Sequence, residues 1–285
     1  MYISVIPLRH SLSKRPYIYF APEAWHDVIH VGSLIEIPIG KHIVTGIVAK
    51  IDVPSWDIVP EDIKSIIRVI ASIELIEPYM ISMIEDIADH YFLPIHKVAS
   101  MFLPAPLLTR LDKKNYLLDR PESQKQILWD KALEIHHYID AIFQREDIIT
   151  YMKPGTVFVF PDDIMLSLFF ASLEEKKRES IQLIPNDLTP ARRVWSWIEI
   201  YSRKHDIIFW TRRILYYNLS QYENIIYIED ALGTEQYTYP IKIQNLDILQ
   251  ALQKSKTHSI ILISSTPSLM TLSYFRQSRM TTIRK

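Results

Sequence analysis

The chain has 285 residues, 48% hydrophobic and 23% charged, which is enough apolar material for ordinary globular cores and typical of about two domains. It has no cysteine, which excludes disulfides, thiolate zinc sites and cysteine nucleophiles and favours a reducing compartment such as the cytoplasm. Only five glycines occur, so enzymes built on glycine-rich phosphate loops are disfavoured. The first residues lack the pattern of a secretory signal, and no apolar segment is free enough of charge to span a membrane.

The net charge of −1 gives no overall field that would attract nucleic acid, but the charge is unevenly distributed. Residues 191–213 hold six basic residues against two acidic ones, and residues 250–285 hold six basic residues and no acid. Residues 132–190 hold five basic and ten acidic residues. Such blocks are typical either of solvated helix faces or of local contact with an anionic partner.

The first part of the chain is rich in short β-branched and aromatic runs separated by proline and glycine. Sequential short strands with tight turns predict a small antiparallel barrel. The expected strands cover residues 2–6, 17–20, 33–38, 43–53 and 64–75. From Pro78 the apolar residues recur at helical spacing, which predicts a helix ending before Pro94 and a shorter one over residues 95–103.

The second part alternates short apolar strands with candidate helices, after a polar and basic linker at residues 107–122 and a helical stretch near residues 123–145. Continuous apolar strands joined by helices predict a parallel sheet covered on both faces. The expected strands are residues 156–160, 181–184, 206–210, 225–229 and 259–263, with helices near residues 163–178, 190–204, 245–254 and 267–277.

Several segments resemble the primosomal replication-restart helicase family, PriA, in the family's own order. YIYFAP (17–22), IPIGK (37–41), IKSIIRVI (63–70) and IADHYFLPIHKVASMFLPAPLL (87–108) resemble its 3′-DNA-binding domain. VFVFPD (157–162), IIFWTRRILYY (207–217), IIYIEDA (225–231) and SSTPSLMTL (264–272) resemble its first RecA-like lobe. The resemblance implies a 3′-DNA-binding domain over residues 1–108, a helical linker over 109–150 and a degenerate RecA-like lobe over 151–285.

The chain departs from the family where nucleotide chemistry would occur. No glycine occurs between Ile47 and Pro154, so the P-loop, which needs glycine for its backbone to wrap phosphate, is absent. Glu229 and Asp230 keep two acids of the magnesium box in swapped order, and Ser264 and Thr266 stand in the Ser-Ala-Thr-Pro box. The second lobe, the zinc-binding cysteines and the winged-helix domain of the family also have no counterpart, so we expect no ATPase activity.

The resemblance assigns DNA contact to seven residues, each with a structural alternative. Tyr17 and Tyr19 would stack on a terminal base, or else pack across strands. Gly40 and Lys41 would let a nucleotide approach and neutralise a phosphate, or else form an ordinary hairpin turn. The weaker candidate, Lys64 beside Arg68, would contact phosphate, or else be a strand lysine at the surface. The remaining two candidates, both in the second part of the chain, are Arg212 and Arg213.

Arg212 and Arg213 follow a parallel strand at the edge where open α/β sheets bind ligands, where RecA-like helicases contact the DNA backbone; the alternative is solvated arginines. Ser264 and Thr266 are expected to cap a helix starting at Pro267. Ile18 replaces an acidic residue of the family, so specific recognition of a 3′ end is expected to weaken. His26 and His30 are four residues apart but lack the glutamate of a zinc motif, so no metal site is expected.

The sequence therefore predicts an α/β protein with a small antiparallel β-barrel domain followed by a RecA-like parallel lobe. The favoured function is cofactor-free DNA binding at replication forks or repair intermediates, with replication-restart proteins as further partners and no membrane. One alternative is a protein-interaction scaffold of the replication machinery. Another is a residual ATP-dependent helicase subunit completed by another chain.

Overall fold

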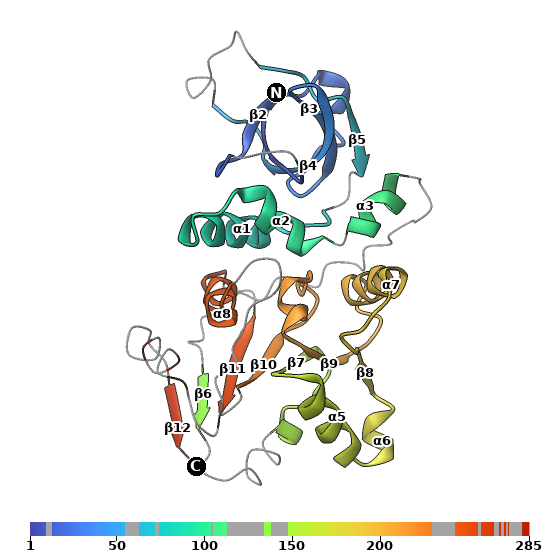
Figure 1. The fold of residues 1–285 in the computed structure, drawn as a ribbon, viewed down its shortest axis with the longest axis vertical. Coiled ribbons are helices and arrows are strands. Elements are labelled where there is room, and N and C mark those ends of the chain that lie inside the picture. Colours follow the sequence, from blue (N-terminus) through green and yellow to red (C-terminus); the bar gives the residue numbers. More distant parts are fainter. Residues whose placement is uncertain are drawn as a thin grey trace. The chain divides into compact units, whose positions relative to one another are not determined.

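The structure is a computed structural model of the whole chain, and it divides into two compact units, Met1–Asp119 and Arg120–Lys285 (Figure 1). The residues it describes are 1–9, 13–54, 63–71, 74–103, 105–112, 134–137, 148–229, 243–255, 258–264, 268, 271, 273 and 281–284. Each unit is described by itself below.

The first unit contains a five-stranded antiparallel sheet with the strand order β2-β1-β4-β3-β5. Its strands are β1 (Tyr2–Pro7), β2 (Tyr17–Phe20), β3 (Leu34–Ile39), β4 (His42–Lys50) and β5 (Arg68–Ala71), with a short 3-10 helix η1 (Glu23–Trp25) after β2. Alternate apolar side chains such as Ile3, Val5, Ile35 and Val48 fill one core, as the two-residue period of a half-buried sheet requires.

The sheet curls, but its closure into a barrel is not confirmed. Among the described residues, the edge strand β2 meets the segment before β5 through a single parallel bridge, Phe20 to Ser65. The Tyr19 hydroxyl also donates a hydrogen bond to the Pro38 carbonyl at 3.0 Å, and this bond brings β2 to the end of β3. The hydrogen-bonded ladders thus define an open sheet whose edges approach each other at one end.

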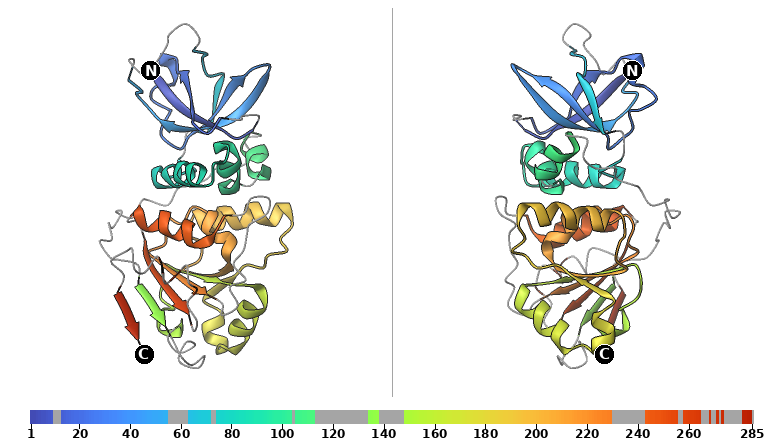
Figure 2. Two further views of the ribbon diagram at one scale, coloured as in Figure 1. Left: turned by 60° about the vertical axis from the view of Figure 1, so that its left-hand side comes forward. Right: turned by 90° about the vertical axis from the view of Figure 1, so that its right-hand side faces the viewer.

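Three helices complete the first unit, namely α1 (Pro78–His90), α2 (Ile95–Phe102) and α3 (Ala105–Asp112). Pro78 occupies the first turn of α1, where its missing N–H costs nothing. Pro94 separates α1 from α2, as the sequence predicts. The buried side of α1 packs on α2, α2 packs on β1, and α3 packs on β5 (Figure 2).

The second unit is built on a seven-stranded parallel sheet with the order β12-β6-β11-β10-β7-β9-β8. This confirms the predicted α/β class, and a parallel sheet with covering helices is the architecture expected of a RecA-like lobe. The strands are β6 (Glu134–His137), β7 (Thr156–Phe160), β8 (Ile181–Leu183), β9 (Ile207–Thr211), β10 (Asn224–Glu229), β11 (Ser259–Ser264) and β12 (Thr281–Arg284).

Helices cover both faces of this sheet, so its central strands are apolar along their whole length (Figures 1 and 2). One face holds α5 (Asp163–Ser172) and α6 (Glu175–Arg178), and the other holds α7 (Pro190–Tyr201) and α8 (Asn245–Lys254). Right-handed crossovers account for this division. The connection from β7 to β8, which contains α5 and α6, runs along the sheet in one direction. The connections from β8 to β9 and from β10 to β11, which contain α7 and α8, run in the opposite direction and so place their helices on the other face.

Two sequence expectations differ from the structure. The helix predicted over residues 163–178 is two helices, because Leu173 and Glu174 adopt extended backbone between them. The helix predicted near residues 123–145 is contradicted at residues 134–137, which form β6 between β11 and β12; the rest of that stretch lies outside the described residues. Pairing with β11 explains why residues 134–137 form a strand and not a helix, since a segment beside an open sheet edge gains a ladder of backbone hydrogen bonds.

Candidate nucleic-acid interface

The two tyrosines of β2 point inward and have different environments. Tyr19 is 5% exposed within the core of the first unit, and burial, with a smaller contribution from Tyr17, raises the pKa of its phenol to about 12. A ring so deeply buried has no free face for a base to stack on. Tyr17 is half-buried and packs against the same core, so it keeps a partly accessible edge.

The hairpin between β3 and β4 presents Gly40 and Lys41 at its tip. Ile39 pairs with His42, which leaves a two-residue loop, and Gly40 has φ +58°, a conformation that glycine adopts without strain. A side chain added at Gly40 would extend into open space, and Lys41 is exposed. The hairpin tip is therefore an accessible surface that carries one positive charge.

Lys64 lies beside β2 at the same end of the sheet. Its carbonyl accepts a hydrogen bond from the Phe20 N–H at 3.0 Å, and the Ile66 N–H donates to the Phe20 carbonyl, also at 3.0 Å. The Lys64 side chain is exposed, whereas Arg68 makes two hydrogen bonds of 2.8 and 2.9 Å to the Glu36 carboxylate. Phosphate contact is thus open to Lys64, while the charge of Arg68 is already paired.

The structure therefore connects three of the predicted residues of the first unit, Tyr19, Gly40 and Lys64, around the end of β3. The hydrogen bond from Tyr19 to Pro38 joins β2 to the hairpin, and the hydrogen bonds of Phe20 join β2 to the Lys64 segment. We call the exposed surface of Gly40, Lys41 and Lys64 the hairpin surface. It combines a glycine turn with two lysines, and Tyr17 is not placed on it by any described contact.

In the second unit, Arg212 and Arg213 begin the 3-10 helix η4 (Arg212–Tyr216) directly after β9, at the carboxyl edge of the sheet. Arg213 is exposed and Arg212 is half-buried. The strand before them is fixed by Asn186, whose Oδ1 accepts hydrogen bonds from the Thr211 hydroxyl at 2.6 Å and from the Trp210 indole at 3.2 Å. Asn186 in turn donates to the Asp163 carboxylate at 3.0 Å.

Sequence reasoning missed Asn186 and Asp163. Asn186 follows β8 after Pro185, and Asp163 follows β7 after Pro161 and Asp162. A polar residue just beyond a strand end is the sequence feature that could have identified each of them. Their connection across the sheet edge follows from the strand order, in which β9 lies between β8 and β7. That order cannot be inferred from the spacing of two residues.

Glu229, at the end of β10, is engaged with the chain itself. It is 3% exposed, its Oε1 accepts a hydrogen bond from the Thr271 hydroxyl at 2.7 Å, and the Ser268 N–H lies 3.4 Å from both carboxylate oxygens. Ser264 is fully buried and pairs with Glu229 across β10 and β11. The buried carboxylate therefore positions the segment after β11, and its oxygens face protein donors.

The helix cap predicted at Thr266 and Pro267 falls outside the described residues, but a serine close behind them makes a capping contact. The side chain that accepts a hydrogen bond from the Thr271 N–H is that of Ser268, at 3.1 Å, which is the spacing of a serine N-cap. Thr266, Pro267 and Asp230 lie outside the described residues.

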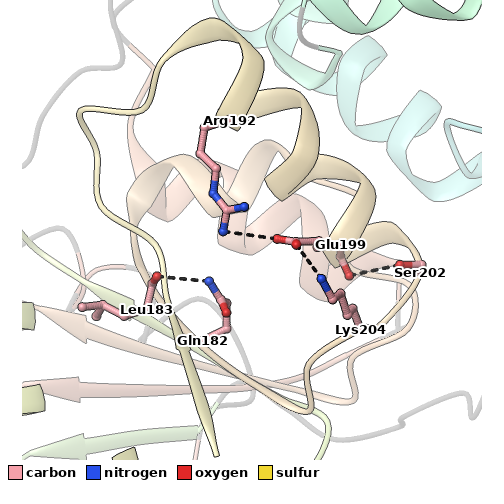
Figure 3. A network of polar contacts seen from close by, with 6 residues as sticks. All are labelled: Gln182, Leu183, Arg192, Glu199, Ser202 and Lys204. Carbon is pink, nitrogen blue, oxygen red and sulfur yellow. Dashed lines mark hydrogen bonds and ion pairs between the residues drawn. The ribbon is translucent and has the colours of Figure 1, made fainter. Parts of the chain in front are cut away.

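Half of the cations in the basic block of residues 191–213 form salt bridges within the second unit. Glu199 on α7 receives Lys204 Nζ at 2.8 Å and Arg192 Nη2 at 3.6 Å (Figure 3), and Arg203 Nε lies 3.5 Å from an Asp206 oxygen. These pairs support the solvated-face interpretation for three of its six cations. Arg213 remains an exposed cation at the sheet edge.

Metal coordination finds no support in the described part of the chain, which contains no group of three His, Asp or Glu side chains placed to hold an ion. His26 Nε2 lies 2.9 Å from the Met1 amino nitrogen and 3.0 Å from the Ala21 carbonyl oxygen. Within the same described ranges, no helix is long and apolar enough to cross a membrane.

Comparison with known proteins defines the class of the first unit. Residues 5–104 match the family model of the PriA 3′ DNA-binding domain (3′BD). This match confirms the part of the resemblance that concerns the 3′-DNA-binding domain, and it supports a PriA-like 3′BD in the first unit. No curated protein matches the chain.

Among solved structures, the chain is similar to the C-terminal domain of a variant of S. cerevisiae Dbp5, solved with a Gle1 variant and IP6. The identity is 10% and the TM-score 0.37, over 53% of this chain and 89% of that one. A similarity at this level supports no conclusion about function, and the α/β class of the second unit rests on its own sheet.

Proposed function

We propose that this protein binds DNA at replication forks or repair intermediates in replication restart, through its PriA-like first unit, and hydrolyses no ATP of its own. The observation that carries the proposal is the match of residues 5–104 to a 3′ DNA-binding domain. The hairpin surface supports it, since exposed Lys41 and Lys64 can neutralise phosphates and Gly40 leaves room for a nucleotide. Replication-restart proteins as partners and a cytoplasmic location belong to the same proposal.

The absence of ATP hydrolysis is supported by two features. The sequence has no P-loop, so nothing supplies the converging backbone N–H groups that hold phosphates. The carboxylate of Glu229, at the position of the family's magnesium box, is buried and hydrogen-bonded to Thr271. Purified protein should show no ATP hydrolysis above background, and ATP with magnesium should leave its Tm unchanged; a rate that falls on Glu229→Gln would contradict this.

The DNA-binding proposal is tested by fluorescence anisotropy with forked, single-stranded and duplex DNA at two or more salt concentrations. Binding should weaken with salt, and Lys41→Ala and Lys64→Ala should each lower the salt slope by roughly one phosphate contact. Lys97→Ala is the matched control, because Lys97 is an exposed lysine of the same unit on α2, away from the hairpin surface. No binding at low salt would overturn the proposal.

One observation favours the alternative of a protein-interaction scaffold. The outer side of α5 carries Ile164 and Leu168, which are 73% and 68% exposed and lie one helical turn apart. Exposed apolar residues grouped on one helix face are typical of protein contact surfaces. If the wild-type protein binds no DNA, this face is where a replication partner would be sought.

A further inference from the structure

Helix α5 packs on the sheet of the second unit through an inner side that is typical of a surface helix. Leu166 is buried there, and the rings of Phe169 and Phe170 lie 5.8 and 6.5 Å from the ring of Phe209 on β9. The opposite side of such a helix is normally polar. Helix α8 follows this rule, since all of its residues that are not buried are polar.

The outer side of α5 is apolar instead. Ile164 and Leu168 are more than two-thirds exposed, Met165 is 36% exposed, and exposed Ala171 follows one turn after Leu168. Seven of the ten residues of α5 are apolar, a composition typical of a helix that is buried on all sides. We call Ile164, Met165, Leu168 and Ala171 the outer stripe. Its composition indicates that another surface covers it.

The spacing of the outer stripe suits a second helix. Ile164, Leu168 and Ala171 are four and three residues apart, so they form one seam along α5, as in paired helices. The small side chain of Ala171 allows a neighbouring helix to approach closely at that end. A helix of ten residues is about 15 Å long, so the seam can hold roughly three turns of a partner helix.

The charges at the two ends of the outer stripe are acidic. Asp162 and Asp163 are exposed at the beginning of α5, and Glu174 and Glu175 are exposed directly after its end. Helix α5 itself has no basic residue. The first cations further along the chain are in α6, where Lys177 Nζ lies 3.9 Å from the Glu174 carboxylate. A partner that covers the stripe therefore gains most from basic residues beside its own apolar ones.

This charge pattern distinguishes three possible occupants. Two copies of α5 packed antiparallel about a two-fold axis would bring the aspartates of one copy to the glutamates of the other, and parallel packing would bring like residues together, so both arrangements are repulsive. An anionic lipid surface attracts basic segments and would repel the same carboxylates. A basic amphipathic helix from another protein meets neither penalty.

We infer that the outer stripe of α5 binds an amphipathic helix of another protein, whose apolar residues pack on Ile164, Leu168 and Ala171 and whose basic residues lie beside Asp163 and Glu174. The inference deepens the scaffold alternative by giving it a surface and a partner chemistry, and it does not depend on DNA binding. An interface of this size is typical of a transient complex.

The experiment uses the full chain and a designed peptide as the probe. The peptide is a fluorescein-labelled amphipathic helix of about 15 residues, with leucines at four- and three-residue spacing and lysines at both ends. A matched peptide has glutamates in place of the lysines. Fluorescence anisotropy should show that the lysine peptide binds and that its binding weakens with salt, while the glutamate peptide binds more weakly.

Substitutions in the chain test whether the peptide occupies the outer stripe. Leu168→Ser should weaken binding of the lysine peptide about 10- to 150-fold, the factor that burial of one leucine supplies. Glu174→Lys should weaken it about two- to fivefold, as expected for an exposed ion pair. Ile43→Ser, at a similarly exposed isoleucine of the first unit, is the matched control and should bind as wild type does. The Tm of all three variants should stay unchanged, because the replaced side chains are exposed.

Four results would overturn the inference. The lysine peptide could fail to bind, or it could bind wild type and Leu168→Ser equally. Sedimentation velocity could show a wild-type dimer that Leu168→Ser makes monomeric, which would assign the stripe to a second copy of the chain. Vesicles containing phosphatidylglycerol could bind wild type but not Leu168→Ser, which would assign it to a lipid surface.

DNA binding is measured on the same samples, so that the two proposals fail separately. Leu168→Ser should bind forked DNA as wild type does, since the hairpin surface belongs to the first unit. If the wild-type protein binds the lysine peptide but no DNA, the proposed function fails and the outer stripe stands. If it binds DNA but not the peptide, the reverse holds.

Discussion

His258 makes the stability of the second unit depend on pH. Its imidazole is 3% exposed and Nε2 lies 3.0 Å from the Leu219 carbonyl oxygen, so the neutral ring donates this hydrogen bond. Burial lowers the pKa of His258 to about 4, and the bond to Leu219 offsets only part of that effect. An unfolded histidine has a pKa near 6.5.

The sign and size of the effect follow from proton binding. Between about pH 6.5 and pH 4 the unfolded chain binds a proton at His258 and the folded chain does not, so the free energy of unfolding falls as the pH falls through this window. The loss levels off below the folded pKa. A difference of about 2.5 pKa units corresponds to about 3 kcal/mol in total, of which about 2 kcal/mol is lost by pH 5.

The assay is urea unfolding at pH 7.5 and pH 5, followed by tryptophan fluorescence, since Trp197 and Trp210 are both buried in this unit. His258→Gln keeps an N–H donor but does not titrate, so it should lose about 2 kcal/mol less than wild type over this pH change. His42→Gln, at an exposed histidine of the other unit, should behave as wild type. Equal losses in wild type and His258→Gln, or an NMR titration of His258 near pH 6.5, would refute the reasoning.

Three other expectations follow from single residues. Gly32→Ala should destabilise the first unit by about 3 kcal/mol in urea unfolding, because Gly32 has φ +88° and an added Cβ would overlap the Ile76 carbonyl oxygen; a loss under 1 kcal/mol would contradict the geometry. Glu229→Ala should cost the second unit about 2 kcal/mol by leaving the Thr271 hydroxyl without its acceptor, and Glu229→Gln less, since an acceptor oxygen remains. Because Ile18 offers no hydrogen bond to a terminal nucleotide, DNA with free and with blocked 3′ ends should bind with affinities within about threefold; a strong preference for free ends would show that other groups recognise the terminus.

Much of the architecture could be predicted from the sequence because it depends on local patterns. Alternating apolar residues, proline positions and continuous apolar strands indicated an antiparallel first part and a parallel, helix-covered second part. The motif around residues 87–108 indicated the PriA-like 3′BD family, and residues 5–104 match that family's model. These signals can be recognised in the sequence alone, since hydrophobic periodicity and the backbone restriction of proline act within a few residues.

The partners of individual side chains were decided only by the tertiary structure. Tyr17 and Tyr19 looked equivalent in the sequence, yet curling of the sheet buries Tyr19 against Pro38 and leaves Tyr17 partly accessible. In the same way, Arg68 finds Glu36 across the sheet, and Glu229 finds Thr271 42 residues further along the chain.

Lys14 likewise meets the Phe92 ring at the end of α1, far along the chain from it. Sequence patterns specify which face of an element is apolar. They do not specify which elements meet, because contacts between distant residues depend on how the whole chain closes its cores.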